Sequence, residues 1–384
     1  MECQLLDLNF SQLIKAWSKS KHNVYSDKAK QDYHNNLKIL FDNLKNENFC
    51  ALDDDGRLKC NLILDFFFRS IEFLDNSTHN LIPFEIVECL KIALKDWIPD
   101  NDNKFIIVTS YVNNMLGFSF DPTLATNKDI YNCLKNRYNI EFTNKLIQIN
   151  LPKYLSRDYL ANVVLYHELG HFLDLYYNIT APISEELSAT YSKLDPSEIS
   201  VLKAYFPFLD DPVNLYQFFP MLISNHLREY FADVFASQYI NSCSCKYLDY
   251  ITNSDANCSL SHPSTINRNK LVEEFLIGKN NILLNKIMES TKIITNLSLQ
   301  KRFDPIDGND FMNLIPIDIE NPEKLHSLFL LGWDFWLQGP KYFSSYNGMS
   351  EALKPGQYYQ IINNLIEKSI GNYIIKVDWE KIKK

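Results

Sequence analysis

Residues 160–177 read LANVVLYHELGHFLDLYY, and this stretch decides the fold that we expect. It is apolar on most sides of a 3.6-residue period, which predicts one long helix buried in the protein. His167 and His171 are four residues apart, so they share one face of that helix and can bind one metal ion. Glu168 lies beside them, within reach of a water on that metal. The alternative is a pair of core histidines that hydrogen-bond to the backbone.

The composition is that of a globular chain: 384 residues, 46% of them hydrophobic and 22% charged, with a net charge of −9. This acidic balance gives no basic face, so we expect no nucleic-acid partner. The first residues, Met1 to Asp7, carry acids where a signal peptide needs Lys or Arg. The longest apolar run, Leu328 to Leu337, is about half as long as a membrane helix needs to be. We therefore expect no transmembrane segment.

Eight cysteines are scattered along the chain, which favours free thiols in a reducing compartment over a disulfide framework. We expect a cytoplasmic protein, and a secreted effector without a classical signal peptide is the alternative. Cys243, Cys245, Cys258 and His262 form a loosely spaced alternative set of zinc ligands.

The periodicity of the chain predicts an α+β protein that is mainly helical, with a small sheet before the histidine-bearing helix. Residues 1–100 have helical spacing and form an expected N-terminal helical region. Lys104–Val112 and Lys145–Leu151 read as strands, with Gly117–Phe120 as a possible short strand between them. Helical spacing returns at Asp158. We therefore expect a catalytic core at 101–270 that contains the metal site, and a C-terminal helical region at 271–384.

Trp333, Phe335 and Trp336 are expected to fill a hydrophobic core, with a substrate-binding platform as the alternative.

A hydrolytic zinc site needs a third protein ligand, and the nearby acids are weak candidates for it. Asp174 is seven residues beyond His167, about 10 Å along the helix axis, so it cannot join both histidines at one ion. Glu185 and Glu186 follow Ser184 in the manner of an ordinary helix start with acids in its first turn. A ligand role for either glutamate stays open as an alternative.

The stronger candidate lies in a second apolar stretch, Leu222–Ile240. Glu229 and Asp233 are four residues apart there, with His226 one turn earlier. Two carboxylates on an apolar face need a cation or a histidine proton. We expect Glu229 to be the third ligand and Asp233 to accept the second N–H of a ligand histidine. The alternative is a solvated acidic stripe.

These pieces together resemble the gluzincin metallopeptidases, and most of all their HtpX and CAAX-protease-like branch. The resemblance rests on His-Glu-Leu-Gly-His at 167–171, Glu-x-x-Ala-Asp at 229–233, and Ser261-His262-Pro263 followed by Arg268. It covers residues 160–268 and implies a zincin-like fold. Two features depart from the family: many members are embedded in membranes, and Arg228 stands where the family often has Asn.

The resulting expectation is a zinc-dependent endopeptidase acting on a protein or peptide substrate. Zinc held by His167, His171 and Glu229 would acidify a water, and Glu168 would accept its proton. Candidates for the donor that stabilises the oxyanion are, in order, His262, Arg268 and His226. The strand at 145–151 is expected to be an edge strand that pairs with an extended substrate. Alternatives are a regulatory or sensor protein that binds a partner through this fold, with slow or single-target cleavage, and a purely structural zinc.

Overall fold

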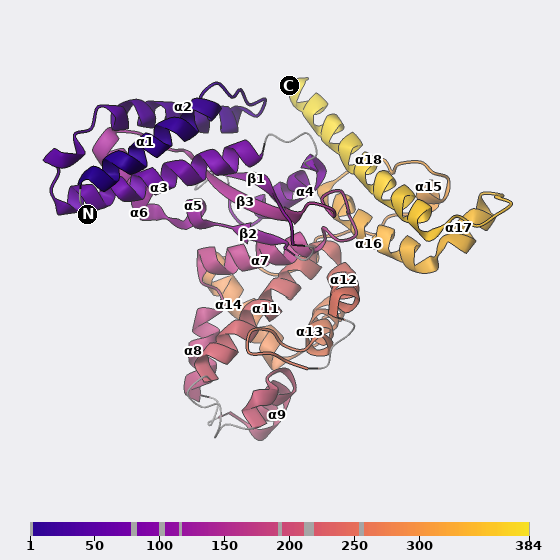
Figure 1. The fold of residues 1–384 in the computed structure, drawn as a ribbon. Helices are drawn as coiled ribbons and strands as arrows, with labels where there is room; N and C mark the ends of the chain where they lie inside the picture. Colours follow the sequence, from indigo (N-terminus) through magenta and orange to yellow (C-terminus); the bar gives the residue numbers. More distant parts are fainter. Residues whose placement is uncertain are drawn as a thin grey trace. The chain divides into compact units, whose positions relative to one another are not determined.

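The computed structural model describes residues 3–77, 83–99, 104–114, 117–190, 194–210, 219–252 and 257–383. The chain divides into two compact units, shown with their elements in Figure 1. The sheet unit comprises residues 1–82 and 98–156, and the helical unit comprises residues 83–97 and 157–384. The division therefore falls at residues 82, 97 and 156, whereas the sequence suggested boundaries at 100 and 270.

The sheet unit contains three strands in the order β1-β3-β2. β1 (Lys104–Val112) runs parallel to β3 (Asn144–Pro152), and β2 (Ser119–Asp121) pairs with β3 in the antiparallel sense. β1 and β3 lie where the residue content of 104–112 and the alternation of 145–151 predicted strands, and β2 overlaps the expected short strand at Gly117–Phe120. The expectation that residues 145–151 form an edge strand is wrong, because β3 has β1 on one side and β2 on the other. A substrate strand therefore has no free edge along the paired length of β3.

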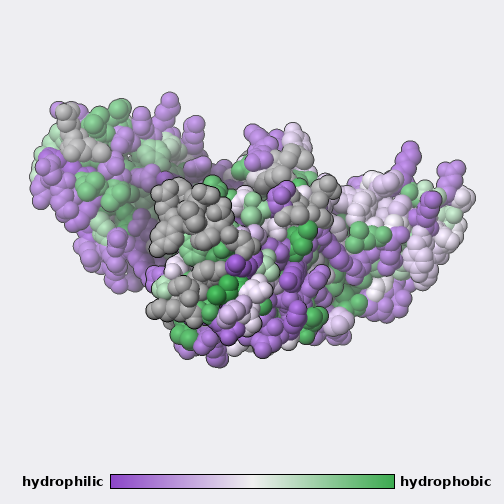
Figure 2. All heavy atoms as spheres, turned by 90° about the horizontal axis from the view of Figure 1, so that it is seen from below, coloured by the Kyte–Doolittle hydropathy of each residue, from purple (hydrophilic) through white to green (hydrophobic). Residues whose placement is uncertain are grey.

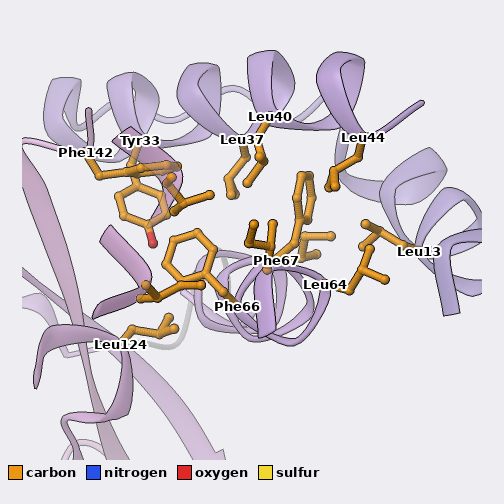
Figure 3. Close-up of a cluster of buried hydrophobic side chains, with 14 of the residues drawn as sticks. Leu13, Tyr33, Leu37, Leu40, Leu44, Leu64, Phe66, Phe67, Leu124 and Phe142 are labelled. Carbon is orange, nitrogen blue, oxygen red and sulfur yellow. The ribbon is translucent and has the colours of Figure 1, made fainter. Parts of the chain in front are cut away.

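The helices of the sheet unit form an aromatic-rich core with the sheet. In Figure 3, Leu37, Leu40 and Leu44 point from α2 toward α3, which carries Phe66 and Phe67. The helices are α1 (Cys3–Ser20), α2 (Lys28–Lys45), α3 (Asp54–Asn76), α5 (Thr123–Thr126) and α6 (Lys128–Tyr138), with a 3-10 turn, η1, at Phe49–Ala51. α3 packs against β1 and β3, so the apolar faces predicted by the helical spacing meet the sheet.

One pair of cysteines corrects the expectation of free thiols. Cys3 at the start of α1 and Cys50 in η1 form a disulfide, although 47 residues separate them in the sequence. The link arises because α1 packs beside η1. Six cysteines are free: Cys60, Cys89, Cys133, Cys243, Cys245 and Cys258. The prediction of a cytoplasmic location loses the support that it drew from free thiols.

The helical unit confirms the mainly helical α+β class, and its zincin-like character remains a prediction. Trp333 and Phe335 are buried as expected, and the Trp333 indole donates a hydrogen bond to the Leu160 carbonyl at 3.0 Å. Its helices are α4 (Phe84–Lys95), α7 (Val164–Tyr177), α8 (Ala181–Thr190), α9 (Pro196–Tyr205), α11 (Phe219–Ile240), α12 (Cys243–Thr252), α13 (Thr265–Ile277), α14 (Ile282–Thr295), α15 (Asn309–Met312), α16 (Pro322–Gln338), α17 (Pro340–Tyr346) and α18 (Pro355–Ile382), with a 3-10 turn, η3, at Pro207–Asp210.

Hydrophobic residues outside the cores are dispersed. Figure 2 shows them scattered among hydrophilic residues on the face that it draws. Within the described residues, no helix has both the length and the hydropathy that a membrane span requires. The expectation of no transmembrane segment agrees with this finding.

The core of the sheet unit generates a stability prediction at Phe67. Its side chain is fully buried, and its ring meets the Trp17 ring edge-on at 5.4 Å. Replacing Phe67 with alanine should lower the free energy of unfolding by about 3–5 kcal/mol, since the substitution leaves a large cavity. The measurement is urea-induced unfolding. The matched control is Leu62→Ala in the same helix, because the Leu62 side chain is 51% exposed and should contribute little. Equal losses in both variants would contradict the packing described for α3.

Candidate metal centre

The two helices that carry the predicted ligands cross at a glycine. A Cβ atom placed on Gly170 of α7 would lie 2.8 Å from the Cα of Ala232 in α11, and 3.2 Å from the Ala232 carbonyl oxygen. Backbone atoms cannot move aside as a flexible side chain can, so only glycine fits at this position. The sequence patterns include Gly170 and Ala232, but nothing in them indicates that these two residues face each other. The crossing brings α7 and α11 close enough for short side chains to meet.

Three side chains meet beside this crossing. Glu229 Oε1 lies 3.2 Å from His171 Nε2, and Glu229 Oε2 lies 3.5 Å from His167 Nε2. One potential ligand atom from each residue lies within 4.8 Å of the other two. In the described part of the chain, this is the one group of three or more such residues that can hold a metal ion. His167 and Glu229 are buried, and His171 is partly exposed.

The spacing of these atoms suits a metal ion. Bonds of about 2.0–2.1 Å in a tetrahedral site put neighbouring ligand atoms roughly 3.3 Å apart. The two observed separations, 3.2 Å to Glu229 Oε1 and 3.5 Å to Glu229 Oε2, are close to that value and involve the two different oxygens of the carboxylate. Two imidazoles and one carboxylate leave a fourth position open, as catalytic zinc sites do. The same donor set also suits ferrous iron, so the residues show a site for a metal ion without naming the metal.

Asp233 makes the contact that the sequence predicted. His167 Nδ1 donates a hydrogen bond to Asp233 Oδ1 at 2.9 Å. This bond fixes the orientation of the ring and leaves Nε2 directed at Glu229. The carboxylate of Asp233 therefore supports the ligand and does not itself bind the metal.

Arg268 holds both carboxylates of α11. Its Nε donates to Asp233 Oδ2 at 2.6 Å and its Nη2 to Asp233 Oδ1 at 2.8 Å, while Nη1 lies 3.3 Å from Glu229 Oε2. The side chain is 9% exposed. A planar guanidinium placed in this way orients two acids at once. The geometry favours a positioning role for Arg268 over the predicted role of oxyanion donor.

These contacts determine the charge state of the cluster when it holds no metal. Burial alone would lower the pKa of His167, but the carboxylates of Asp233 and Glu229 outweigh burial and raise that pKa to about 10. Burial would raise the pKa of Glu229, but hydrogen bonds from His167 and His171 hold it well below its usual range. A proton and a metal ion therefore compete for His167, and metal affinity should increase with pH.

His226 hydrogen-bonds a loop, and it is not one of the three residues of the metal-holding group. It is fully buried, and its Nε2 is 2.9 Å from the Ser259 carbonyl oxygen. Burial lowers the pKa of His226, so the ring is neutral and donates this bond. Asn225 donates a second bond to the Leu260 carbonyl at 3.2 Å. The start of α11 thus anchors the loop that carries His262.

His262 is the predicted donor that does approach the centre. Its Nε2 lies 3.6 Å from Glu229 Oε1, and its side chain is 57% exposed. Its Nδ1 and the hydroxyl of Ser261 are 2.8 Å apart. This placement leaves the predicted role of oxyanion donor open. The alternative set of zinc ligands is not assembled. Within the described residues, Cys243, Cys245, Cys258 and His262 do not form a metal-holding group.

The other acids that the sequence singled out lie elsewhere or have other partners. Asp174 is buried and accepts hydrogen bonds from the backbone N–H and the hydroxyl of Thr180, both at 2.8 Å. Glu185 and Glu186 are exposed on α8, and Glu186 pairs with Lys286 at 2.6 Å. Neither glutamate therefore belongs to the metal-holding group.

Glu168 is half-buried beside His167 and makes no hydrogen bond or ion pair with any described residue.

A pocket of about 360 Å³ opens onto the ligands. Residues of α7, of α11 and of the loop with His262 line it. Its lining residues are His171, Asp174, Leu175, Asn225, Arg228, Glu229, Ser261 and His262. The pocket gives a small molecule or a peptide side chain access to the metal position.

The crossing of α7 and α11 predicts that Gly170→Ala will impair metal binding. The added methyl group meets the backbone of Ala232, so the helices must separate and Glu229 must retreat from both histidines. We expect a loss of about 1–3 kcal/mol in the free energy of unfolding, together with weaker metal binding. The measurements are urea-induced unfolding and a competitive zinc titration with a chromophoric chelator.

The matched control is Gly371→Ala in α18, where a Cβ atom would meet nothing within 4 Å. That variant should be as stable as the parent protein or slightly more stable, because alanine has the higher helix propensity. Parental zinc affinity in Gly170→Ala would contradict the role assigned to the crossing.

Comparisons with protein-family models, with curated proteins and with solved structures found no match for this chain. The resemblance to gluzincins therefore rests on the residues at 167–171, 229–233 and 261–268 alone, and membership of that family remains a prediction.

Proposed function

We propose that the protein is a zinc-dependent peptidase. One observation carries the proposal: His167, His171 and Glu229 surround a metal position on which an accessible pocket opens. The carboxylate of Glu168 is adjacent in sequence to the first ligand and has no structural partner among the described residues. A purely structural zinc would be closed by a fourth protein ligand and would need no such carboxylate.

In the proposed hydrolysis, different residues of the chain would bind the metal, accept the proton and stabilise the oxyanion. A zinc ion at this position supplies Lewis acidity that acidifies water and polarises a carbonyl group. His167, fixed by Asp233, and His171 and Glu229 would hold that ion. Glu168 would accept a proton from the attacking water and return it to the leaving amine. His262, which lines the pocket and is exposed, would be the donor to the developing oxyanion.

A protein or peptide is the substrate class that fits this proposal. The pocket has an apolar residue, Leu175, beside polar residues from α11, which suits an amino-acid side chain. The net charge of −9 gives no support to a nucleic-acid substrate. The other reading is a regulatory protein in which the metal holds a binding surface together.

The substitution Glu168→Gln separates these two readings. Glutamine keeps the size of the side chain but cannot accept a proton from water at neutral pH. Zinc content and thermal stability should be unchanged, because Glu168 is not a ligand. Peptide hydrolysis by the zinc-loaded protein should fall by at least 10²- to 10⁴-fold. The measurement is cleavage of a mixed peptide library, followed by mass spectrometry with and without a chelator.

Glu289→Gln, at an exposed position on α14, serves as the matched control and should cleave at the parental rate. If a biological activity survives Glu168→Gln but disappears in His167→Ala, the peptidase reading fails and the regulatory reading takes its place. Metal-dependent cleavage that survives Glu168→Gln would contradict the role of Glu168 as the base.

A further inference from the structure

We infer that Arg228 selects substrates by binding a carboxylate group next to the metal centre. The inference rests on the proposed function and names the chemical class of substrate that the same pocket takes. Arg228 precedes the ligand Glu229 on α11 and lines the pocket. Asn225, Arg228 and Glu229 are spaced by three and four residues, so one face of α11 presents all three to the pocket.

The guanidinium of Arg228 has one ion-pair contact among the described residues, and that contact is long. It makes no hydrogen bond with any described residue, and its Nε lies 3.7 Å from Asp174 Oδ2. That separation is long for an ion pair in which one partner is surface-exposed. Each oxygen of the Asp174 carboxylate also accepts a hydrogen bond from Thr180, so Asp174 has closer partners than Arg228. The Arg228 side chain is 54% exposed and therefore accessible from the pocket.

Glu229, the second acid that lines the pocket, also has other cationic or hydrogen-bonding partners. Glu229 lies between His167 and His171, and Arg268 approaches the same carboxylate. Among the described residues that line the pocket, Arg228 is the one permanently charged cation. A divalent metal at the centre adds positive charge to the same space. The loaded pocket is therefore suited to an anionic group.

A carboxylate is the anion that a polypeptide offers. A guanidinium can bind both oxygens of a carboxylate through two parallel hydrogen bonds, which gives direction as well as charge. Leu175, which is 55% exposed, lines the same pocket and can contact the methylene groups of an acidic side chain. The carboxylate can come from an Asp or Glu side chain or from the C-terminus of the substrate, and the experiment distinguishes these two sources.

The test measures binding to the full-length, zinc-loaded Glu168→Gln protein, so that no peptide is consumed. The probes are fluorescently labelled peptides read by anisotropy. One series is amidated at the C-terminus and moves a single Glu along an otherwise uncharged peptide. A second peptide has no Glu and a free C-terminal carboxylate. The reference peptide has no Glu and an amidated C-terminus.

We expect at least one carboxylate peptide to bind on the order of tenfold more tightly than the reference. In the same background, Arg228→Gln should remove that preference, Arg228→Glu should reverse it, and Arg228→Lys should retain part of it. Lys292→Gln removes one exposed cation from α14 of the same unit and should retain the full preference. The zinc content of each variant verifies that the centre is intact.

The inference is overturned if the preference survives Arg228→Gln, if no carboxylate peptide exceeds the reference, or if no peptide binds. Its failure is distinct from that of the proposed function. If the parent protein, with Glu168 intact, cleaves peptides whether or not they carry a carboxylate, the inference fails and the peptidase proposal stands. If peptide binding depends on Arg228 but the parent protein cleaves no peptide, the peptidase proposal fails and the inference about Arg228 stands.

Discussion

The close approach of α7 and α11 is the constraint on which the candidate centre depends. With Gly170 against the backbone of Ala232, Glu229 can reach two histidines that are fixed one turn apart on the facing helix. A larger residue at the crossing would meet the backbone of Ala232 and push the helices apart, whereas a ligand set keeps its geometry only within about half an ångström. The helix packing therefore creates the metal position, and the ligand side chains only complete it.

The same crossing gathers charges that must balance in a buried setting. His167, Glu229, Asp233 and Arg268 are all buried. Buried charges persist only when they are paired and hydrogen-bonded, and removing one partner leaves the others uncompensated. Arg268 balances the two carboxylates, and His167 contributes positive charge when it holds a proton. A bound metal ion would replace that proton, so the cluster is organised for a cation in either state.

The sequence predicted those features that follow from periodicity along one element. Four-residue spacing placed His167 with His171 and Glu229 with Asp233, and β-branched content and alternation located β1 and β3. Features that depend on which residues of other elements lie nearby in the folded chain were not predictable from periodicity. Periodicity does not reveal that β3 is central, that Cys3 meets Cys50, or that His226 turns toward a loop. Arg268 was found as part of a pattern, but its bonds to Asp233 required the tertiary structure.

The metal content of three variants is the most direct test of the account. Purified protein is incubated with zinc, freed of unbound metal, and analysed for metal per chain. The account predicts one metal ion per molecule in the parent protein and in Glu186→Ala, and a large loss in Glu229→Ala and His171→Ala. A parent protein that binds no transition metal, or a loss of metal that follows Glu186 instead of Glu229, would contradict the centre described for α7 and α11.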